Sequence, residues 1–197
     1  QPEPGPDLYS LLSQATLAKK QLDSSVCEGL SNLGINPSAI ITVERKNIIT
    51  HFPVYTGAPL KSEDSSQRKI KNDYKGDHSK LCDATRSSVV VDNEEDLAKV
   101  LKAFIDCQFT GIKVVRLKNR FANPMFTGIR DCLMNVEIES SNGEKHIGEV
   151  QLHFAPILEL KGDCHIYYEF FREFFAGQDS SYKTRLQMFE CLMEVRE

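Results

Sequence analysis

Several familiar signatures are missing from this chain of 197 residues. It contains no apolar run near the length of a membrane span, and its N-terminus lacks the apolar centre of a secretory signal peptide. No P-loop, kinase glycine loop or GxGxxG motif occurs, so the common nucleotide-binding folds find no support by motif. We therefore expect a protein without a membrane partner.

An excess of positive charge and paired cysteine motifs are also missing. The net charge of −4 at pH 7 argues against a generic nucleic-acid-binding module, although a local basic groove is compatible with it. Six cysteines are scattered without a CxxC spacing, and several lie inside apolar periodic runs, as is typical of small buried residues. We expect free thiols, and hence a reducing compartment and a cytoplasmic location.

The residues that are present have ordinary proportions for a globular protein, with 41% hydrophobic and 26% charged. The length suits one domain with a sizeable core. We expect an N-terminal helix and a lead-in strand in residues 1–57, a core in 58–176 and a C-terminal helix in 177–197. The chain ends within a helical pattern, which is compatible with a piece of a longer protein that has flanking domains.

Helices are predicted where apolar residues recur every three or four positions. The first runs from Asp7 to the stop at Gly34, and the third follows the caps Asp92 and Asn93 and buries a stripe that ends at Ile105. The remaining predicted helices are Lys61 to Tyr74, 155–160, 165–175 and 182–195.

Strands are predicted from alternation and β-branched residues, above all in Gly111–Phe154, which has the pattern strand, loop, strand, tight turn, strand. Asn142-Gly143 supplies the tight turn. Ala39–Phe52 is interpreted as one strand or a short hairpin, and Pro53–Leu60 as a loop. Ser87–Leu117 has the order strand, helix, strand of a βαβ-like unit.

Two carboxylates lie where a metal site is plausible. Glu149 and Gln151 share one face of the last strand, and an apolar face with Val150 lies opposite. Asp83 comes just before the strand Ser87–Val91. Carboxylates that converge in this way suit Mg²⁺, whose other ligands would be water or phosphate oxygens.

A basic segment precedes Asp83. Arg68, Lys71 and Lys75 lie three and four residues apart, nearly on one helix face. This pattern fits either a solvated helix face or a rim that binds phosphate, and the sequence leaves both open.

Taken in order, these segments resemble the RelA/SpoT-like synthetase family, which makes alarmones by pyrophosphoryl transfer. The resemblance covers about Ala58 to Arg172. The matching segments are the basic helix 61–75, Asp83-Ala84-Thr85-Arg86, residues 115–121, Gly128-Ile129-Arg130-Asp131, Glu149-Val150-Gln151, and His165 with Tyr168 and Arg172.

The resemblance implies an α+β fold with a mixed β-sheet flanked by helices, related to nucleotidyltransferases. Asp83 and Glu149 match the catalytic carboxylates that hold Mg²⁺. The positions implied for ATP and its phosphates are Lys61, Arg68, Lys69, Lys71, Lys75, Arg86 and Lys118. In such enzymes a ribose 3′-hydroxyl attacks the β-phosphorus of ATP, AMP leaves, and the acceptor gains a pyrophosphate.

The acceptor side departs from the family. Ile129 stands where the family has a tyrosine that stacks on guanine, and Met125 and Thr127 stand where it commonly has Lys and Asn. Phe126 is a candidate replacement for the missing ring. The other residues assigned to the acceptor side are Arg120, Arg130, Gln151 and His165.

The sequence therefore predicts an ATP-dependent pyrophosphokinase that uses Mg²⁺ and a nucleotide or RNA acceptor of an unusual kind. Two alternatives stay open. One is an inactive RelA/SpoT-like module that senses nucleotides or binds proteins. The other is a toxin-like domain that modifies RNA.

Overall fold

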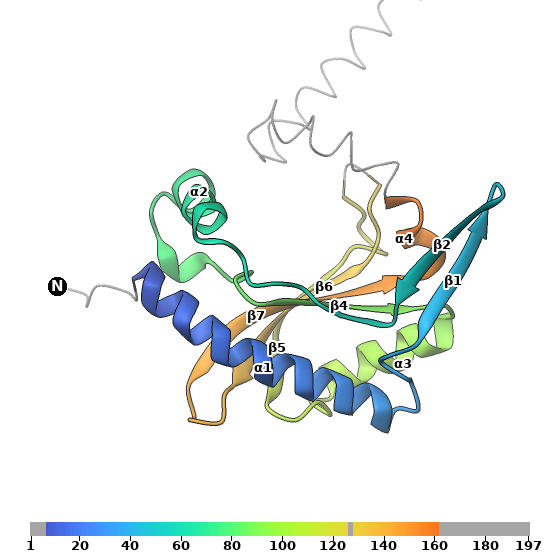
Figure 1. Ribbon diagram of the computed structural model, residues 1–197, viewed down its shortest axis with the longest axis horizontal. Coiled ribbons are helices and arrows are strands. Elements are labelled where there is room, and N and C mark those ends of the chain that lie inside the picture. The colour runs from blue at the N-terminus through green and yellow to red at the C-terminus, as the bar shows by residue number, and fades with distance from the viewer. Residues whose placement is uncertain (1–6, 126–127, 162–197) are drawn as a thin grey trace, which may run out of the picture.

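The computed structural model describes residues 7–125 and 128–161, and there it forms an α+β fold around one mixed sheet. The strands of this sheet are β3 (Tyr55–Gly57), β4 (Arg86–Val91), β5 (Ile112–Asn119), β6 (Cys132–Glu139) and β7 (Lys145–Phe154). Their spatial order is β3-β4-β7-β6-β5, with β4 parallel to β7 and the other neighbours antiparallel (Figure 1). This architecture confirms the predicted fold class.

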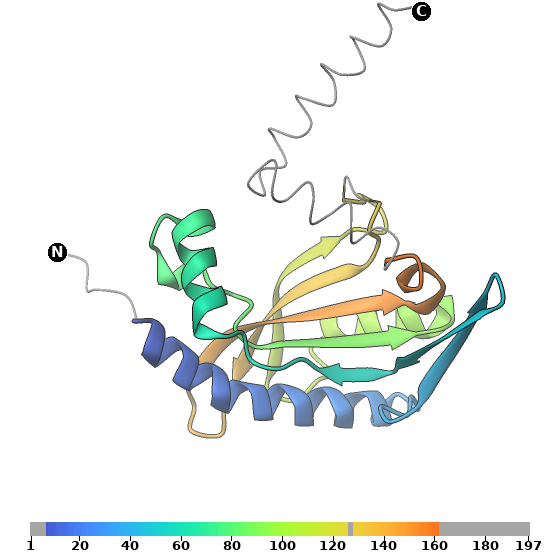
Figure 2. The same ribbon diagram turned by 45° about the horizontal axis from the view of Figure 1, so that its top comes forward.

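Two long helices cover one face of the sheet. They are α1 (Leu8–Asn32) and α3 (Glu94–Ile105), which lie beneath the strands in Figure 1, and in the turned view of Figure 2 α3 lies behind them. On the other side, α2 (Glu63–Tyr74) and the one-turn α4 (Ala155–Leu158) stand at opposite ends of the sheet (Figure 1). A short 3₁₀ turn, η1 (His78–Lys80), follows α2. The middle of this second face is therefore free of any helix among the described residues.

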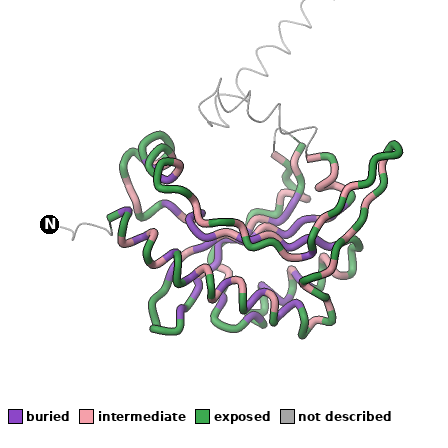
Figure 3. Tube along the Cα trace, viewed as in Figure 1, coloured by how far each residue is buried: buried purple, intermediate pink, exposed green. Residues whose placement is uncertain are grey.

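The main core lies between the sheet and the helices α1 and α3, where buried residues concentrate (Figure 3). From α1 it takes Leu22, Val26 and Leu30, and from the sheet it takes alternate residues such as Met134 and Val150. Burying each such side chain contributes about 1.5–3 kcal/mol, so this face is held firmly. A smaller core joins the N-terminal half of α1 to α2 and to the segment that leads into β4.

A separate hairpin projects beyond the sheet. It consists of β1 (Ile40–Arg45) and β2 (Ile48–Pro53), paired antiparallel. This resolves the prediction for Ala39–Phe52 in favour of the hairpin. Arg45 Nη1 donates to Glu159 Oε2 at 3.1 Å, which ties the hairpin to the end of α4.

Several sequence predictions need correction. The segment Pro53–Leu60, predicted to be a loop, contains the edge strand β3, whose backbone pairs with β4. The helix predicted from Lys61 begins at Glu63, because the Ser62 hydroxyl accepts from Ser65 N and caps it there. Ile105, assigned to the buried stripe of α3, is 53% exposed.

The βαβ-like unit is present, but its two strands are not neighbours. β7 and β6 lie between β4 and β5 in the sheet. The four described cysteines, Cys27, Cys82, Cys107 and Cys132, are free thiols, as predicted, but only Cys132 is buried. The helices predicted at 165–175 and 182–195 lie outside the described residues.

No helix within residues 7–125 and 128–161 has the length and apolar character that crossing a membrane requires.

Candidate active site

A row of polar side chains crosses the open face of the sheet. Arg116 lies opposite Asn135, Asn135 opposite Glu149, and Glu149 opposite Arg86, so the row spans β5, β6, β7 and β4. Arg116 Nε donates to Asn135 Oδ1 at 2.8 Å. These residues alternate with the buried residues of the helix-covered face, which is why they share one surface. The row is the floor of the candidate site.

Glu149 occupies the centre of this row. Its side chain is half-buried, and Gln151 Nε2 donates to its Oε1 at 2.7 Å. Its backbone N–H donates to Thr85 O at 2.9 Å, which holds β7 against the start of β4. Gly148 permits this approach, because a Cβ there would lie 3.2 Å from Thr85 O and 2.7 Å from Ile138 Cδ1. The sequence Gly148-Glu149 thus places the carboxylate beside the entrance to β4.

Asp83 lies just before that entrance and is buried. Its Oδ2 accepts from Lys61 Nζ at 3.0 Å and from Lys69 Nζ at 2.7 Å. Its Oδ1 is buried and has no hydrogen-bond partner among the described residues. Burial opposes ionisation of this carboxyl, but the bonds and charges of Lys69 and Lys61 outweigh it and lower its pKa.

Local packing fixes the segment that carries Asp83. Leu81 and Ala84 lie in the small core with Ile70 of α2, so Asp83 projects between that helix and the sheet. Thr85 Oγ1 donates to Ala15 O at 2.9 Å, and Lys61 N donates to Ala84 O at 3.1 Å. The two residues that follow Asp83 are therefore tied, Thr85 to α1 and Ala84 to Lys61.

The Cys82 thiol, next to Asp83 in the chain, lies within range of the charges of both carboxylates and of two basic neighbours. Burial is the main reason that the pKa of this thiol is raised. The charges of Arg116 and Lys69 act against the rise, and those of Asp83 and Glu149 add to it. Residues from α2, β5 and β7 thus converge here from distant parts of the sequence.

The donor set suits Mg²⁺ better than a transition metal. No group of three or more His, Cys, Asp and Glu side chains that could hold a metal occurs within residues 7–125 and 128–161. Mg²⁺ typically takes one or two carboxylates and completes its shell with water and substrate phosphates. The unpartnered Asp83 Oδ1 is a buried oxygen of the kind that such an ion needs.

The predicted phosphate-binding residues separate into two groups. Arg86 belongs to the polar row, with a buried Nε that has no described hydrogen-bond partner, and Lys118 lies in the next row, opposite Leu133. Arg86, at the start of β4, forms the group on the Asp83 side with Lys61 and Lys69, whereas Lys118 lies on β5 at the opposite edge of the sheet.

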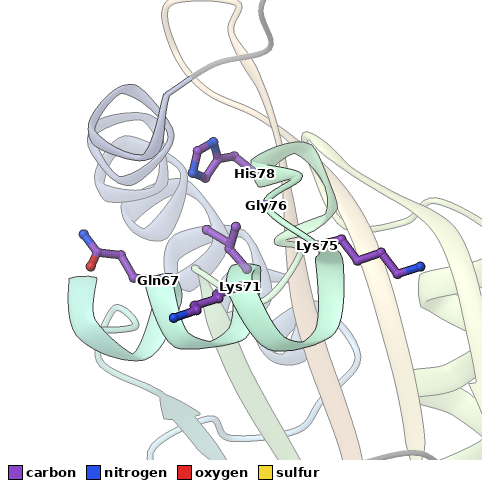
Figure 4. Close-up of a pocket in the computed structure, with 6 residues that line it drawn as sticks. Gln67, Lys71, Lys75, Gly76 and His78 are labelled. Atoms are coloured by element: carbon purple, nitrogen blue, oxygen red, sulfur yellow. The ribbon is translucent and has the colours of Figure 1, made fainter.

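The other group consists of Lys71 and Lys75. Lys71 and Lys75 line a shallow, open pocket on the outer side of α2, together with His78 (Figure 4). Lys71 is two residues from Lys69, about 200° around a helix axis, so the two project in opposite directions. Arg68 is exposed, and its Nη2 lies 3.4 Å from Ser65 Oγ.

The predicted acceptor-side residues have varied positions. Arg120 forms an ion pair with the buried Asp131, and Arg130 Nη1 donates to Phe121 O at 2.9 Å. Ile129 is half-buried. Phe126 and His165 lie outside the described residues.

Two basic residues at this face were not identified from the sequence. In a regular strand Arg116 would share the core-facing side with Val114, but a register shift between them turns Arg116 to the open face. Only the irregular basic alternation of 113–118 hinted at this.

Lys161 follows α4 and carried no signal in the sequence. Burial lowers its pKa, and the charges of Asp131 and Glu149 act to raise it, so it lies near both carboxylates. It extends the basic surroundings of the site to the far end of β7.

Comparison of the sequence with protein-family models found no match, and comparison with curated proteins found no significant one. Solved structures do match. The small alarmone synthetase 2 from Bacillus subtilis is 17% identical with a TM-score of 0.61, and the match covers 97% of this chain and 98% of that chain. The small alarmone synthetase 1 from the same organism is 16% identical with a TM-score of 0.59, covering 94% and 95%.

A GTP pyrophosphokinase family protein from Streptococcus pneumoniae is 15% identical with a TM-score of 0.55, covering 90% of this chain and 81% of that chain. These likenesses extend over nearly the whole chain. The chain therefore has the fold of the RelA/SpoT-like synthetases, at a sequence distance where likeness defines the fold.

Proposed function

We propose that this protein transfers pyrophosphate from ATP to a ribose 3′-hydroxyl of a nucleotide or RNA, with Mg²⁺ as cofactor. The observation that carries the proposal is the state of Asp83. Two lysines hold one of its oxygens, and the other is buried, without a partner among residues 7–125 and 128–161, beside the row that contains Glu149. A carboxylate arranged in this way suits a metal and a polyphosphate together.

We assign each residue a role according to its position in the site. Asp83 and Glu149 would hold Mg²⁺, which would neutralise charge that develops on the phosphates. Lys61 and Lys69 approach Asp83 from the α2 side and would bind ATP phosphates as point charges. Arg86 and Lys118 supply positive charge from the sheet. Lys71 lies on the opposite side of α2 from Lys69, so we assign it no part in binding ATP.

In the proposed step the acceptor 3′-oxygen attacks the β-phosphorus of ATP. The bond between that phosphorus and the oxygen bridging to the α-phosphate breaks, and AMP leaves with the electron pair. The hydroxyl proton passes to Glu149, which Gln151 orients through the bond to Oε1. The acceptor keeps the β- and γ-phosphates as a pyrophosphate.

The identity of the acceptor is the least defined element. The structure of the small alarmone synthetase 1 from Bacillus subtilis with its product pppGpp supports a nucleotide acceptor for this fold. In our chain Ile129 has no aromatic ring to stack on a base. We therefore propose an acceptor that is not held by the guanine stacking expected of the family.

The test is a transfer assay with Mg²⁺ and ATP labelled on its β- and γ-phosphates. GTP, GDP, ATP, ADP and total tRNA are offered in parallel. Wild-type protein is compared with Glu149→Gln and with Glu139→Gln, which removes an exposed carboxylate from the neighbouring strand. We expect label on one acceptor with release of AMP, no label with Glu149→Gln, and normal transfer with Glu139→Gln.

The alternatives predict different results. Binding of Mg-ATP without transfer to any acceptor would contradict the proposal and favour the inactive nucleotide-sensing module. Label on tRNA alone would agree with the proposed transfer and would identify RNA as the acceptor, as in the RNA-modifying alternative. Transfer that survives in Glu149→Gln would remove Glu149 from the mechanism.

A further inference from the structure

The two oxygens of Asp83 are closed to solvent in different ways. Lys61 Nζ and Lys69 Nζ donate to Oδ2 at 3.0 and 2.7 Å. Oδ1 is buried and has no hydrogen-bond partner within residues 7–125 and 128–161. The side chains of Asp83, Lys61 and Lys69 are 11%, 14% and 22% exposed, so little water surrounds these bonds. A hydrated cation from solution therefore meets no accessible oxygen on this carboxylate.

The backbone that carries Asp83 is fixed, whereas the two ammonium groups are carried on flexible stems. Leu81 and Ala84 are buried in the small core, and Thr85 Oγ1 donates to Ala15 O at 2.9 Å. A lysine side chain, by contrast, can turn its ammonium to another partner while its backbone stays in place. Access of a ligand to Asp83 therefore depends on movement of the two lysine side chains.

Lys69 has a second partner close to Asp83. Its Nζ lies 5.6 Å from the centroid of the Tyr74 ring, within the range of a cation–π contact. Burial acts to lower the pKa of Lys69, but the bond and charge of Asp83 outweigh it, with a smaller contribution from Tyr74, and raise this pKa. Lys69 is therefore charged, and the ring attracts its ammonium when it leaves Asp83.

Positive charge exceeds negative charge around Asp83. The charges of Lys69, Arg116 and Glu149 all act on the thiol of the preceding residue, and Lys61 forms an ion pair with Asp83 itself. The two carboxylates among these described residues therefore face a larger number of cations. Such surroundings repel a free divalent cation, whereas a nucleotide polyphosphate brings enough negative charge to reverse the balance.

A metal and the two lysines compete for the same carboxylate. Mg²⁺ gives up its water reluctantly and needs an accessible carboxylate oxygen. Phosphate oxygens form strong charge-assisted bonds with ammonium groups, so a bound polyphosphate draws Lys61 and Lys69 away from Asp83. The carboxylate that they leave is then available to a metal that arrives with the phosphates.

We propose that Lys61 and Lys69 are specificity-determining residues that keep free divalent cations off Asp83 and admit the metal only together with a polyphosphate that takes over both ammonium groups. This inference rests on the proposed transferase function, because it takes Mg²⁺ and ATP as the ligands of the site. It adds to phosphate binding a second role for the lysines, which is to couple the metal to the nucleotide. By linkage, each ligand then raises the affinity for the other by the same factor.

The first test measures the binding of a free metal and needs no turnover. Mn²⁺ is the probe, because it takes the same kinds of oxygen ligand as Mg²⁺ and its unbound fraction is measured by electron paramagnetic resonance. The full chain is titrated without nucleotide. We expect weak binding to the wild-type protein and binding at least 10-fold tighter to Lys69→Met, because one competing ammonium group is gone.

Control variants connect the gained affinity with Asp83. Lys71→Met removes a cation from the opposite side of the same helix and should bind Mn²⁺ as the wild type does. Lys69→Met combined with Asp83→Asn should lose the gained affinity. Lys61→Met has the same expected result as Lys69→Met and keeps the test decisive if Lys69→Met does not fold. An unchanged Kd for Mn²⁺ in the folded lysine variants would overturn the proposal.

A second titration measures the coupling. The ligand is an ATP analogue with a methylene group between its α- and β-phosphorus atoms, which cannot release AMP. Its Kd is measured by isothermal titration calorimetry with and without Mn²⁺, and complex formation in solution cancels when variants are compared. The gain in affinity from Mn²⁺ should be at least 10-fold smaller in Lys69→Met than in wild type, and unchanged in Lys71→Met. Equal gains in Lys69→Met and wild type would overturn the coupling.

The outcomes separate this inference from the proposed function. If the wild-type protein transfers pyrophosphate but the lysine variants gain no affinity for Mn²⁺, the competition at Asp83 is refuted and the proposed function stands. If Lys69→Met gains the affinity but no acceptor is labelled by the wild-type protein, the proposed function fails and the competition at Asp83 stands.

Discussion

Two buried aspartates stand at the margins of the same polar face, and their surroundings differ in kind. Asp83 meets two lysines on a single oxygen, and its other oxygen has no described partner. Asp131 meets one arginine fork that engages both of its oxygens. A lysine ammonium is a point charge on a flexible stem and can exchange its carboxylate partner for a phosphate, whereas an arginine in a bidentate pair is held by both bonds to its carboxylate. The surroundings of Asp83 therefore suit the binding of a ligand. Those of Asp131 suit a structural role at the base of the loop between β5 and β6.

The largest expected effect tests the ligand-binding side of this comparison. Asp83→Asn keeps the shape of the side chain but removes the charge that would hold Mg²⁺. We expect the transfer rate to fall roughly 10³-fold, which corresponds to about 4 kcal/mol. The rate is measured with labelled ATP, and urea unfolding serves as the control for folding. Loss of rate in proportion to loss of folded protein would contradict a metal-binding role.

For Asp131→Asn, at the structural aspartate, we expect the main effect on stability and not on the transfer rate. Arg120 would keep a buried charge without its counter-ion, so we expect the free energy of unfolding to fall by about 3–5 kcal/mol. Urea denaturation measures it. Glu137→Gln, at the exposed pair with Lys145, should leave the unfolding midpoint almost unchanged. If the two variants behaved alike, Asp131 would have no special structural role.

A pH dependence extends the comparison to the neighbour of Asp131. Burial is the main cause that lowers the pKa of His153 to about 4, and Lys161 and Arg120 add to it. The unfolded chain has an ordinary histidine pKa near 6.5, so between these values it binds the proton that the folded chain excludes. Stability is therefore fully present above pH 6.5 and is lost as the pH falls toward 4, by on the order of 3 kcal/mol.

The measurement is urea unfolding of wild-type and His153→Gln protein at several pH values from 7 to 4. The variant should lose less stability than wild type over this range. His51→Gln, at an exposed histidine of the hairpin, should follow wild type. Equal slopes for all three proteins would exclude His153 as the source.

The smallest effect separates the two sides of α2. Lys69→Met removes a cation that bonds Asp83, and we expect Mg-ATP binding to weaken roughly 10-fold. Lys71→Met removes a cation on the opposite side and should change binding less than about 2-fold. Isothermal titration calorimetry checks both. A larger loss with Lys71→Met would return that residue to the phosphate-binding group.

Much of the fold could be predicted because it follows from local patterns. Alternation defines β6 and β7, Asn142-Gly143 forms their turn, and Asn93 caps α3 as expected. β3 was missed because an edge strand of three residues has too few positions to show alternation. Its pairing with β4 depends on a partner about 30 residues away along the chain.

For the candidate site, residue types were easier to predict than orientations. Asp83 and Glu149 were singled out from the sequence, and their catalytic role stays a prediction. The basic helix was identified, but the residue of it that bonds Asp83 is Lys69, and Lys71, about 200° around the helix axis from Lys69, lies on the opposite side. A helical pattern states which residues share a face, and packing against the rest of the protein decides where that face points.

The sequence by itself determined the period of the longer helices and strands, the cap of α3, the turn between β6 and β7 and the two carboxylates flanked by basic residues. Only the tertiary structure decided that Lys61 and Lys69 form ion pairs with Asp83. It also decided that the register shift in β5 turns Arg116 to the open face and that Arg120 forms an ion pair with Asp131. The physical reason is the distance along the chain between the residues that interact. Caps, turns and alternation depend on neighbours a few residues apart, whereas strand order, register and ion-pair partners depend on contacts between segments far apart in the chain.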